Sequence, residues 1–164
     1  MENIWAPWRM EYIQMEIDGL KGCFLCEARD STDDRDRLVL DRRDVAFAIM
    51  NRYPYTNGHI MAVPNRHVAD FESLTPEELA GLMSIVQDSI AILKKAVSAQ
   101  GFNVGINLGK TAGAGLADHL HIHIVPRWLG DTNFMPVCSD FKIISEHIMD
   151  TFDRLKPFFD KCAG

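Results

Sequence analysis

The sequence lacks several features that define other classes of protein. Its 164 residues contain no apolar run of about 20 residues, so no segment is expected to span a membrane. The opening MENIWAPWRMEY has neither the apolar core nor the small-residue cleavage site of a signal peptide. Repeats, low-complexity tracts and Gly/Ser linkers are also absent. The length suits one hydrophobic core, so we expect a single domain over residues 1–164, located in the cytoplasm.

Positive charge and cysteine are both scarce. The 17 Lys and Arg residues are outnumbered by 23 Asp and Glu residues, giving a formal net charge of −6. This balance argues against a specific or general nucleic-acid partner but leaves room for a local pocket that binds a small anion. Cys23 and Cys26 form a C-x-x-C pair, whereas Cys138 and Cys162 stand apart. Without a signal peptide, this arrangement predicts cytosolic thiols or metal ligands.

The order of predicted elements favours an α+β fold. Residues 45–51 (VAFAIMN) and 59–64 (HIMAVP) have the composition of strands, and the turn between them contains Pro54 and Asn57-Gly58, which predicts a hairpin. The polar stretch 27–44 is expected to be a solvated loop that leads into this hairpin. Short connections of this kind favour an antiparallel sheet with helices on one face.

Two helices and two further strands complete the prediction. The clearest helix begins after Thr75, which serves as N-cap with Glu78 as its capping-box partner, and ends at Gly101. Strands are expected on either side of the glycine-rich GKTAGAG, over FNVGINLG and HLHIHIVPRW. A second helix is predicted over residues 139–159, limited by Pro157, with His147 on its surface.

Half of the histidines lie in DHLHIHIVPRW, at every second position. Alternate side chains of a strand share a face, so His119, His121 and His123 are expected on one side, opposite an apolar side. Two uses of three imidazoles remain open at this point. They can hold a catalytic metal with one open position, or one ring can be a nucleophile that its neighbours orient.

Two other segments carry potential ligands. GKTAGAG resembles the end of a phosphate-binding P-loop, but the preceding Gly105 is one residue too close, so we reject that motif. The loop can still present backbone N–H groups to an anion, or it is simply a hairpin connection. Cys23 and Cys26 have the spacing of zinc ligands or of a redox pair, and zinc would need two histidines in addition.

Several segments together resemble the histidine-triad (HIT) family. The family's defining H-x-H-x-H-x-x is present at His119-Leu-His121-Ile-His123-Ile-Val, and NRYPYTNGH resembles its first hairpin turn. INLGKTAGAG resembles the loop before the triad, and the similarity runs from about Cys23 to Trp128. IWAPWRMEYI and PRWLGDTNFMPV further resemble a bacterial branch described as diadenosine-tetraphosphate phosphorylases or hydrolases.

The resemblance implies a fold and a chemistry. The fold is a small antiparallel sheet with one long helix and a C-terminal helix, paired as a homodimer. The chemistry is attack of the middle histidine, here His121, on the α-phosphorus of a nucleotide, giving a covalent nucleotidyl-histidine that water or phosphate resolves. His123 and His59 match positions that support the nucleophile. The positions that match ribose and phosphate contacts are Asn51, Asn107, Gly113 and Gly115.

The resemblance also implies a structural zinc ion and no organic cofactor. Its ligands would be Cys23, Cys26, His67 and His119, which leaves His121 and His123 free of metal. The chain departs from the family at Gly115-Leu116, where many members carry Gln-Ser or Gln-Thr, so phosphorolysis and hydrolysis both stay open. The alternatives are a metallohydrolase that uses all three histidines as ligands and a non-catalytic nucleotide-binding protein.

Overall fold

The computed structural model describes residues 22–131 and 146–162, and its core is a five-stranded antiparallel sheet. The strand order is β1-β2-β3-β5-β4. The strands are β1 (Val39–Arg42), β2 (Ala46–Met50), β3 (Ile60–Pro64), β4 (Gly101–Ile106) and β5 (Ile122–Arg127). The helices are α2 (Phe24–Asp30), α3 (Asp34–Arg37), α4 (Pro76–Ala96) and α6 (Ile148–Cys162), with 3-10 turns η1 (Phe71–Ser73) and η2 (Lys110–Ala112). The predicted α+β fold is confirmed.

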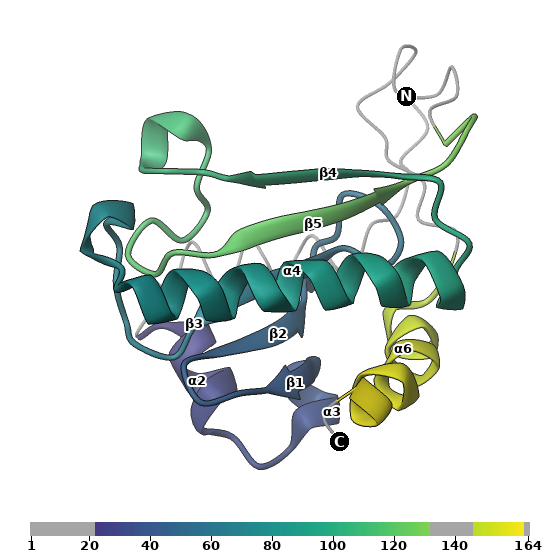
Figure 1. Ribbon diagram of the computed structural model, residues 1–164, viewed down its shortest axis with the longest axis horizontal. Coiled ribbons are helices and arrows are strands. Elements are labelled where there is room, and N and C mark those ends of the chain that lie inside the picture. Colours follow the sequence, from purple (N-terminus) through teal and green to yellow (C-terminus); the bar gives the residue numbers. More distant parts are fainter. Residues whose placement is uncertain (1–21, 132–145, 163–164) are drawn as a thin grey trace, which may run out of the picture.

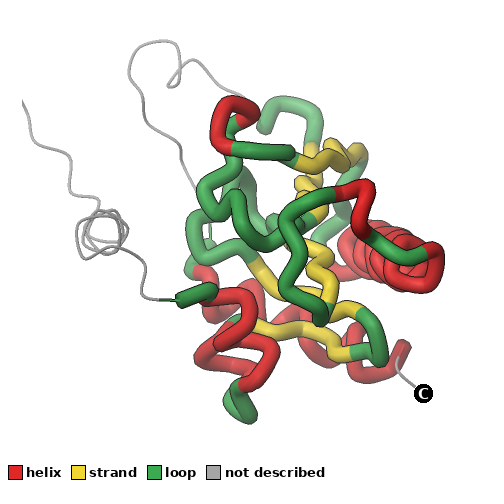
Figure 2. The backbone as a smooth tube through the Cα atoms, turned by 90° about the vertical axis from the view of Figure 1, so that its left-hand side faces the viewer, coloured by secondary structure: helices red, strands yellow, loops and turns green. Residues whose placement is uncertain are grey.

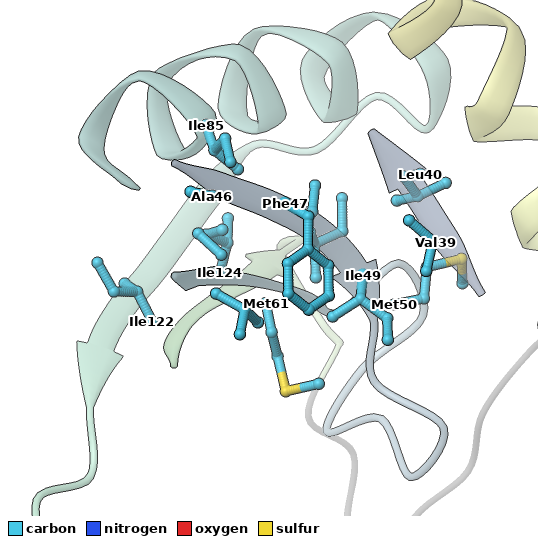
Figure 3. Close-up of a cluster of buried hydrophobic side chains, with 14 of the residues drawn as sticks. Val39, Leu40, Ala46, Phe47, Ile49, Met50, Met61, Ile85, Ile122 and Ile124 are labelled. Atoms are coloured by element: carbon cyan, nitrogen blue, oxygen red, sulfur yellow. The ribbon is translucent and has the colours of Figure 1, made fainter. Parts of the chain in front are cut away.

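Helices lie on both sides of the sheet, not on one face as the sequence predicted. The long helix α4 crosses one face, where it contacts β2, β3 and β5, and α6 packs against α4 and β1 (Figure 1). Seen from the side, the strands lie between α4 and the short helices α2 and α3 (Figure 2). Figure 3 shows Ile85 of α4 pointing toward the sheet, while Phe47 and Met61 point to the other side. The face away from α4 is therefore the one that carries the odd-numbered residues of β2, β3 and β5.

The β2–β3 hairpin forms as predicted. The two strands pair from Met50 with Ile60 to Ala46 with Pro64. Gly58 has a positive φ of 75°, a conformation that glycine adopts without steric cost. The side chain of Asn57 donates to Glu146 Oε2 (3.0 Å) and accepts from Thr151 Oγ1 (2.8 Å), so the turn is tied to the start of α6.

The start of α4 has the predicted cap. Thr75 Oγ1 accepts from the backbone N–H of Glu78, and the Glu78 carboxylate accepts from the backbone N–H of Thr75. Arg66 donates to both carboxylate oxygens at 2.9 and 2.8 Å. The Arg66 guanidinium, followed by the Thr75 N–H, lowers the pKa of Glu78 from 4.5 to about 2.

A Glu78→Gln variant should therefore lose stability in a pH-dependent way. The depressed pKa of Glu78 stabilises the fold fully above pH 4.5, and this contribution disappears as the pH falls toward 2. We expect urea unfolding to report a loss of about 1 kcal/mol near neutral pH, shrinking below about pH 4. Because both proteins carry the same histidines and cysteines, other titrations cancel in the difference. A pH-independent difference would show that the cap acts without the charge.

Several predictions about the elements are wrong. The stretch 27–44 is not a solvated loop, because it contains most of α2, all of α3 and β1, with Leu38, Val39 and Leu40 buried. The C-terminal helix is not limited by Pro157 but continues to Cys162. Leu155 and Phe159, on either side of that proline, are almost fully buried, so packing offsets the lost hydrogen bond. His147 is exposed as expected but precedes α6.

The strand of the triad also begins later than predicted. β5 starts at Ile122, so His119 and His121 precede the ladder with β3. The backbone N–H of Leu120 instead donates to the carbonyl of Val68 (2.7 Å), which lies in the loop after β3. Residues 119–121 therefore precede β5, and Leu120 bonds to the loop after β3 rather than to β3 itself. The first part of the predicted 139–159 helix lies outside the described residues.

Candidate active site and metal centre

A pocket of about 670 Å³ lies on the face of the sheet opposite α4. Ile49, Met61 and His123 stand in one cross-strand row at its floor, because Ile49 pairs with Met61 and Met61 pairs with His123. The described residues that line the pocket are Phe24, Glu27, Ala28, Asp36, Arg37, Leu38, Ile49, Met50, Asn51, Arg52, Tyr53, Tyr55, Met61, Asn107, Gly113, Gly115, Leu116, His121 and His123.

His121 reaches this pocket with one ring nitrogen already engaged. Its Nδ1 lies 2.9 Å from the backbone carbonyl of His119. A carbonyl only accepts, so Nδ1 carries the proton and the lone pair of the neutral ring is on Nε2. Burial lowers the pKa of His121, which keeps the ring neutral near pH 7. The local backbone thus leaves Nε2 available as a nucleophile.

His59 and His123 form a directed hydrogen-bond relay beside it. The backbone N–H of Tyr55 donates to Nδ1 of His59 (3.1 Å), so the proton of the neutral His59 ring is on Nε2. That atom lies 3.0 Å from Nδ1 of His123, which accepts. Burial, followed by the neighbouring His121, lowers the pKa of His123 to about 4, so His123 is neutral with its proton on Nε2.

The relay ends in an unused donor. Within the described residues, the buried Nε2 of His123 has no hydrogen-bond partner. A buried N–H without a partner is costly, and such groups in native structures commonly mark a ligand or catalytic position. His123 lines the pocket together with His121, so its N–H and the His121 lone pair serve the same space.

The structure places the predicted nucleotide-binding residues around these histidines. Asn51, Asn107, Gly113 and Gly115 all line the pocket, and so does Leu116. Asn51 Oδ1 accepts from the backbone N–H of Tyr53 (2.9 Å), which orients the amide. His59 is fully buried behind His123 rather than in the pocket wall.

Several lining residues were not anticipated from the sequence. An apolar group comes from α2, the end of α3 and the sheet: Phe24, Leu38, Ile49, Met50 and Met61. Tyr53 and Tyr55 come from the β2–β3 turn, and Arg37 and Arg52 add positive charge. The sequence predicted the strands but assigned no face to these side chains, and only the pairing of Ile49 with Met61 and of Met61 with His123 brings them to the histidines' face.

The four predicted metal ligands form one cluster. The ligand atoms of Cys23, Cys26, His67 and His119 all lie within 4.8 Å of one another. Nδ1 of His119 is 3.2 Å from Cys23 Sγ and 3.5 Å from Cys26 Sγ, and Nδ1 of His67 is 3.3 Å from Cys26 Sγ. A tetrahedron with Zn–S near 2.3 Å and Zn–N near 2.0 Å has edges of roughly 3.3–3.8 Å. The donor set and the three contacts of 3.2–3.5 Å therefore fit zinc.

His119 is oriented for this cluster. Its Nε2 lies 2.9 Å from the backbone carbonyl of Pro64, so Nε2 carries the proton and Nδ1 turns its lone pair to the cysteines. A hydrogen bond of this kind to the second nitrogen is typical of histidine metal ligands. Burial raises the pKa of the Cys26 thiol, and the hydrogen bond with Cys23 and the charge of Cys23 raise it further.

Comparison with known proteins identifies the family. A profile described as the HIT domain matches residues 33–128, which is more than half of the chain and includes the whole sheet. The chain belongs to the HIT family. The resemblance inferred from the triad and the hairpin is confirmed.

Relatives of this HIT protein include named enzymes. An AP-4-A phosphorylase of Mycobacterium tuberculosis is 39% identical over 157 residues, which cover 92% of this chain and 80% of the relative. An asymmetrical bis(5'-nucleosyl)-tetraphosphatase of Schizosaccharomyces pombe is 36% identical over 93 residues, covering 57% of this chain and 50% of the relative.

Solved structures confirm the HIT fold. A zinc-bound histidine triad family protein from Mycobacterium smegmatis superposes with a TM-score of 0.69 at 23% identity, covering 87% of this chain and 96% of the other. A hypothetical histidine triad nucleotide-binding protein from Sulfolobus tokodaii gives 0.65 at 26% identity, covering 85% and 90%. Among the described residues of this HIT protein, no helix has the length and apolar character needed to cross a bilayer.

Proposed function

We propose that this HIT protein cleaves dinucleoside polyphosphates, such as diadenosine tetraphosphate, at an α-phosphorus through a nucleotidyl-His121 intermediate. The observation that carries the proposal is the hydrogen bond from His121 Nδ1 to the His119 carbonyl, which leaves the Nε2 lone pair for attack beside a nucleotide-sized pocket. The M. tuberculosis and S. pombe relatives are named for the same class of substrate.

His121 and His123 have different roles in the proposed reaction. Nε2 of His121 forms a bond to the α-phosphorus while the bond from that phosphorus to the bridging oxygen breaks. The leaving polyphosphate takes the electron pair, and the Nε2–H of His123 donates to the departing oxygen. The buried donor of His123 thereby gains the partner that the described residues do not provide.

The remaining pocket residues bind the nucleotide. The apolar group of Phe24, Leu38, Ile49 and Met61 offers a surface for a nucleobase. We assign the ribose to Asn51 and the phosphates to the backbone N–H groups near Gly113 and Gly115, because these residues line the pocket and match the family positions for those contacts. The nucleophile, the donor to the leaving group and the residues that bind the nucleotide then all line the one pocket on this face of the sheet.

The choice of acceptor is decided by a product assay. With diadenosine tetraphosphate, transfer of the nucleotidyl group to phosphate gives ATP and ADP, whereas transfer to water gives ATP and AMP. We propose phosphate as the acceptor, because Leu116 offers no side-chain hydrogen bond at the lip and the M. tuberculosis relative is named a phosphorylase. Rapid quench with α-phosphate-labelled substrate should trap labelled His121. Binding of the substrate without any product would instead identify a non-catalytic nucleotide-binding protein.

We also propose that Cys23, Cys26, His67 and His119 hold a structural Zn²⁺. Bound there, zinc would join the N-terminal end of α2 to the loop after β3 and to the triad segment. A catalytic metal on all three triad histidines is disfavoured, because His119 Nδ1 faces the cysteines and His123 Nδ1 faces His59. Thiolate ligands require reduced cysteines, in keeping with a cytoplasmic setting.

We propose that the chain forms a single domain over residues 1–164 and that two copies of it pair as a homodimer. Among the described strands, β4 is at an edge of the sheet, and Val104 on β4 and Leu108 just after it are 44% and 50% exposed. An exposed edge with apolar side chains is suited to pairing with a second copy. Light scattering coupled to size exclusion should give twice the mass of one 164-residue chain.

A further inference from the structure

Tyr55 packs directly on the histidine relay from the β2–β3 turn. Its ring stacks on that of His59, with centroids 4.8 Å apart and planes inclined by 22°. The Tyr55 ring also lies 5.8 Å from the ring of His123, inclined by 41°. The rings of His59 and His123 are 5.1 Å apart, so the three rings form one contiguous group.

The backbone of the same residue holds the same histidine. The N–H of Tyr55 donates to Nδ1 of His59, which determines that the His59 proton is on Nε2. His59 is fully buried, whereas the Tyr55 side chain is 45% exposed and lines the pocket. One turn residue thus controls both the protonated nitrogen of His59, through its backbone, and the plane of the His59 ring, through its side chain.

We propose that Tyr55 is a positioning residue, whose ring and backbone N–H hold His59 and thereby aim the Nε2–H of His123 into the pocket. The ring torsion of histidine is broad, so a stacked neighbour is needed to keep one orientation. If His59 turns, its Nε2 leaves Nδ1 of His123, and His123 is no longer restricted to the tautomer that donates into the pocket. The direction of the His123 Nε2–H follows from the geometry alone. Only the identity of the oxygen that accepts from it rests on the proposed function.

Long-range proton–nitrogen NMR of the imidazoles tests the geometry without any substrate. In the wild type, His59 and His123 should each show a single neutral tautomer with the proton on Nε2. Tyr55→Phe, which keeps the ring, should give the same pattern. Tyr55→Ala keeps the backbone N–H but removes the ring that holds His59 in line with it, so the nitrogen shifts of both histidines should move toward the average of two tautomers. Phe24→Leu, in the same pocket but on α2, is the control and should leave them unchanged.

Kinetics tests the consequence. Tyr55→Ala should lower kcat for diadenosine tetraphosphate roughly three- to ten-fold with little change in KM, and Tyr55→Phe should restore it. In a His123→Ala background, Tyr55→Ala should cost nothing further, because both changes act on the same donor. An equal loss in that background, or a change confined to KM, would overturn the proposal in favour of direct substrate contact. Unaltered tautomers in Tyr55→Ala would also overturn it. A wild type that cleaves no dinucleoside polyphosphate would refute the proposed function and leave the NMR result standing.

Discussion

His121→Asn is expected to lower kcat for dinucleoside polyphosphates by at least about 10³-fold. The substitution removes the Nε2 lone pair that the His119 carbonyl leaves available, and no other imidazole in the described pocket has its lone pair placed in the same way. The ring is buried, but asparagine is smaller and polar, so the pocket stays open. Nucleotide affinity should remain within about three-fold of wild type, because binding depends on the other lining residues.

The measurement is a rapid quench followed by a binding assay on the same preparation. Wild type should form an acid-labile labelled histidine, and His121→Asn should form none. His123→Asn is the matched control: it removes the imidazole N–H that assists the leaving group rather than the nucleophile, so the labelled histidine should still form, but about 10²-fold more slowly than in wild type. Normal labelling of His121→Asn would exclude the proposed intermediate.

Cys23→Ser/Cys26→Ser is expected to abolish metal binding and to lower the free energy of unfolding. A ligand that binds only the folded state at about a thousand times its Kd contributes about 4 kcal/mol, and serine does not replace a thiolate ligand. The loss should be reproduced in wild type by a strong chelator, and the chelator should have no effect on the double variant. Metal content by mass spectrometry and urea unfolding measure both effects without reference to activity.

Cys162→Ser provides the control for this experiment. Cys162 is exposed at the end of α6, outside the four-residue cluster, so the same chemical change there should leave metal content and stability unaltered. Metal that persists in the double variant would contradict the structural site and revive a triad-bound ion.

The sequence predicted the parts of this molecule whose signals are local. The hairpin at Asn57-Gly58 and the capping box at Thr75 depend on neighbouring residues, and both form as predicted. The HIT motif located the histidines and the cluster ligands, because the triad and C-x-x-C spacings are short. Which nitrogen of each ring carries the proton was not readable, since it depends on the carbonyls of His119 and Pro64.

Signals that depend on tertiary packing were missed. The stretch 27–44 is rich in charge, but its apolar residues at 38–40 form part of the core. Its charged side chains also make specific contacts: Arg42, for example, donates to backbone carbonyls at the end of α2. Pro157 is a helix breaker in isolation, yet burial of Phe159 carries α6 past it. Tyr55 was part of a turn signal, and only the folded chain brings its ring onto His59.

His119 contributes to two structures through different atoms. Its imidazole faces the cysteine cluster, whereas its main-chain carbonyl orients His121. Every amino acid has that carbonyl, so a change of the side chain at position 119 alters the proposed metal ligand and leaves the acceptor in place. The proposed metal site and the orientation of the proposed nucleophile can therefore change independently during evolution. A descendant of this chain could abandon its cysteines and the imidazole at 119 and keep its chemistry, provided that other packing holds α2 against the sheet.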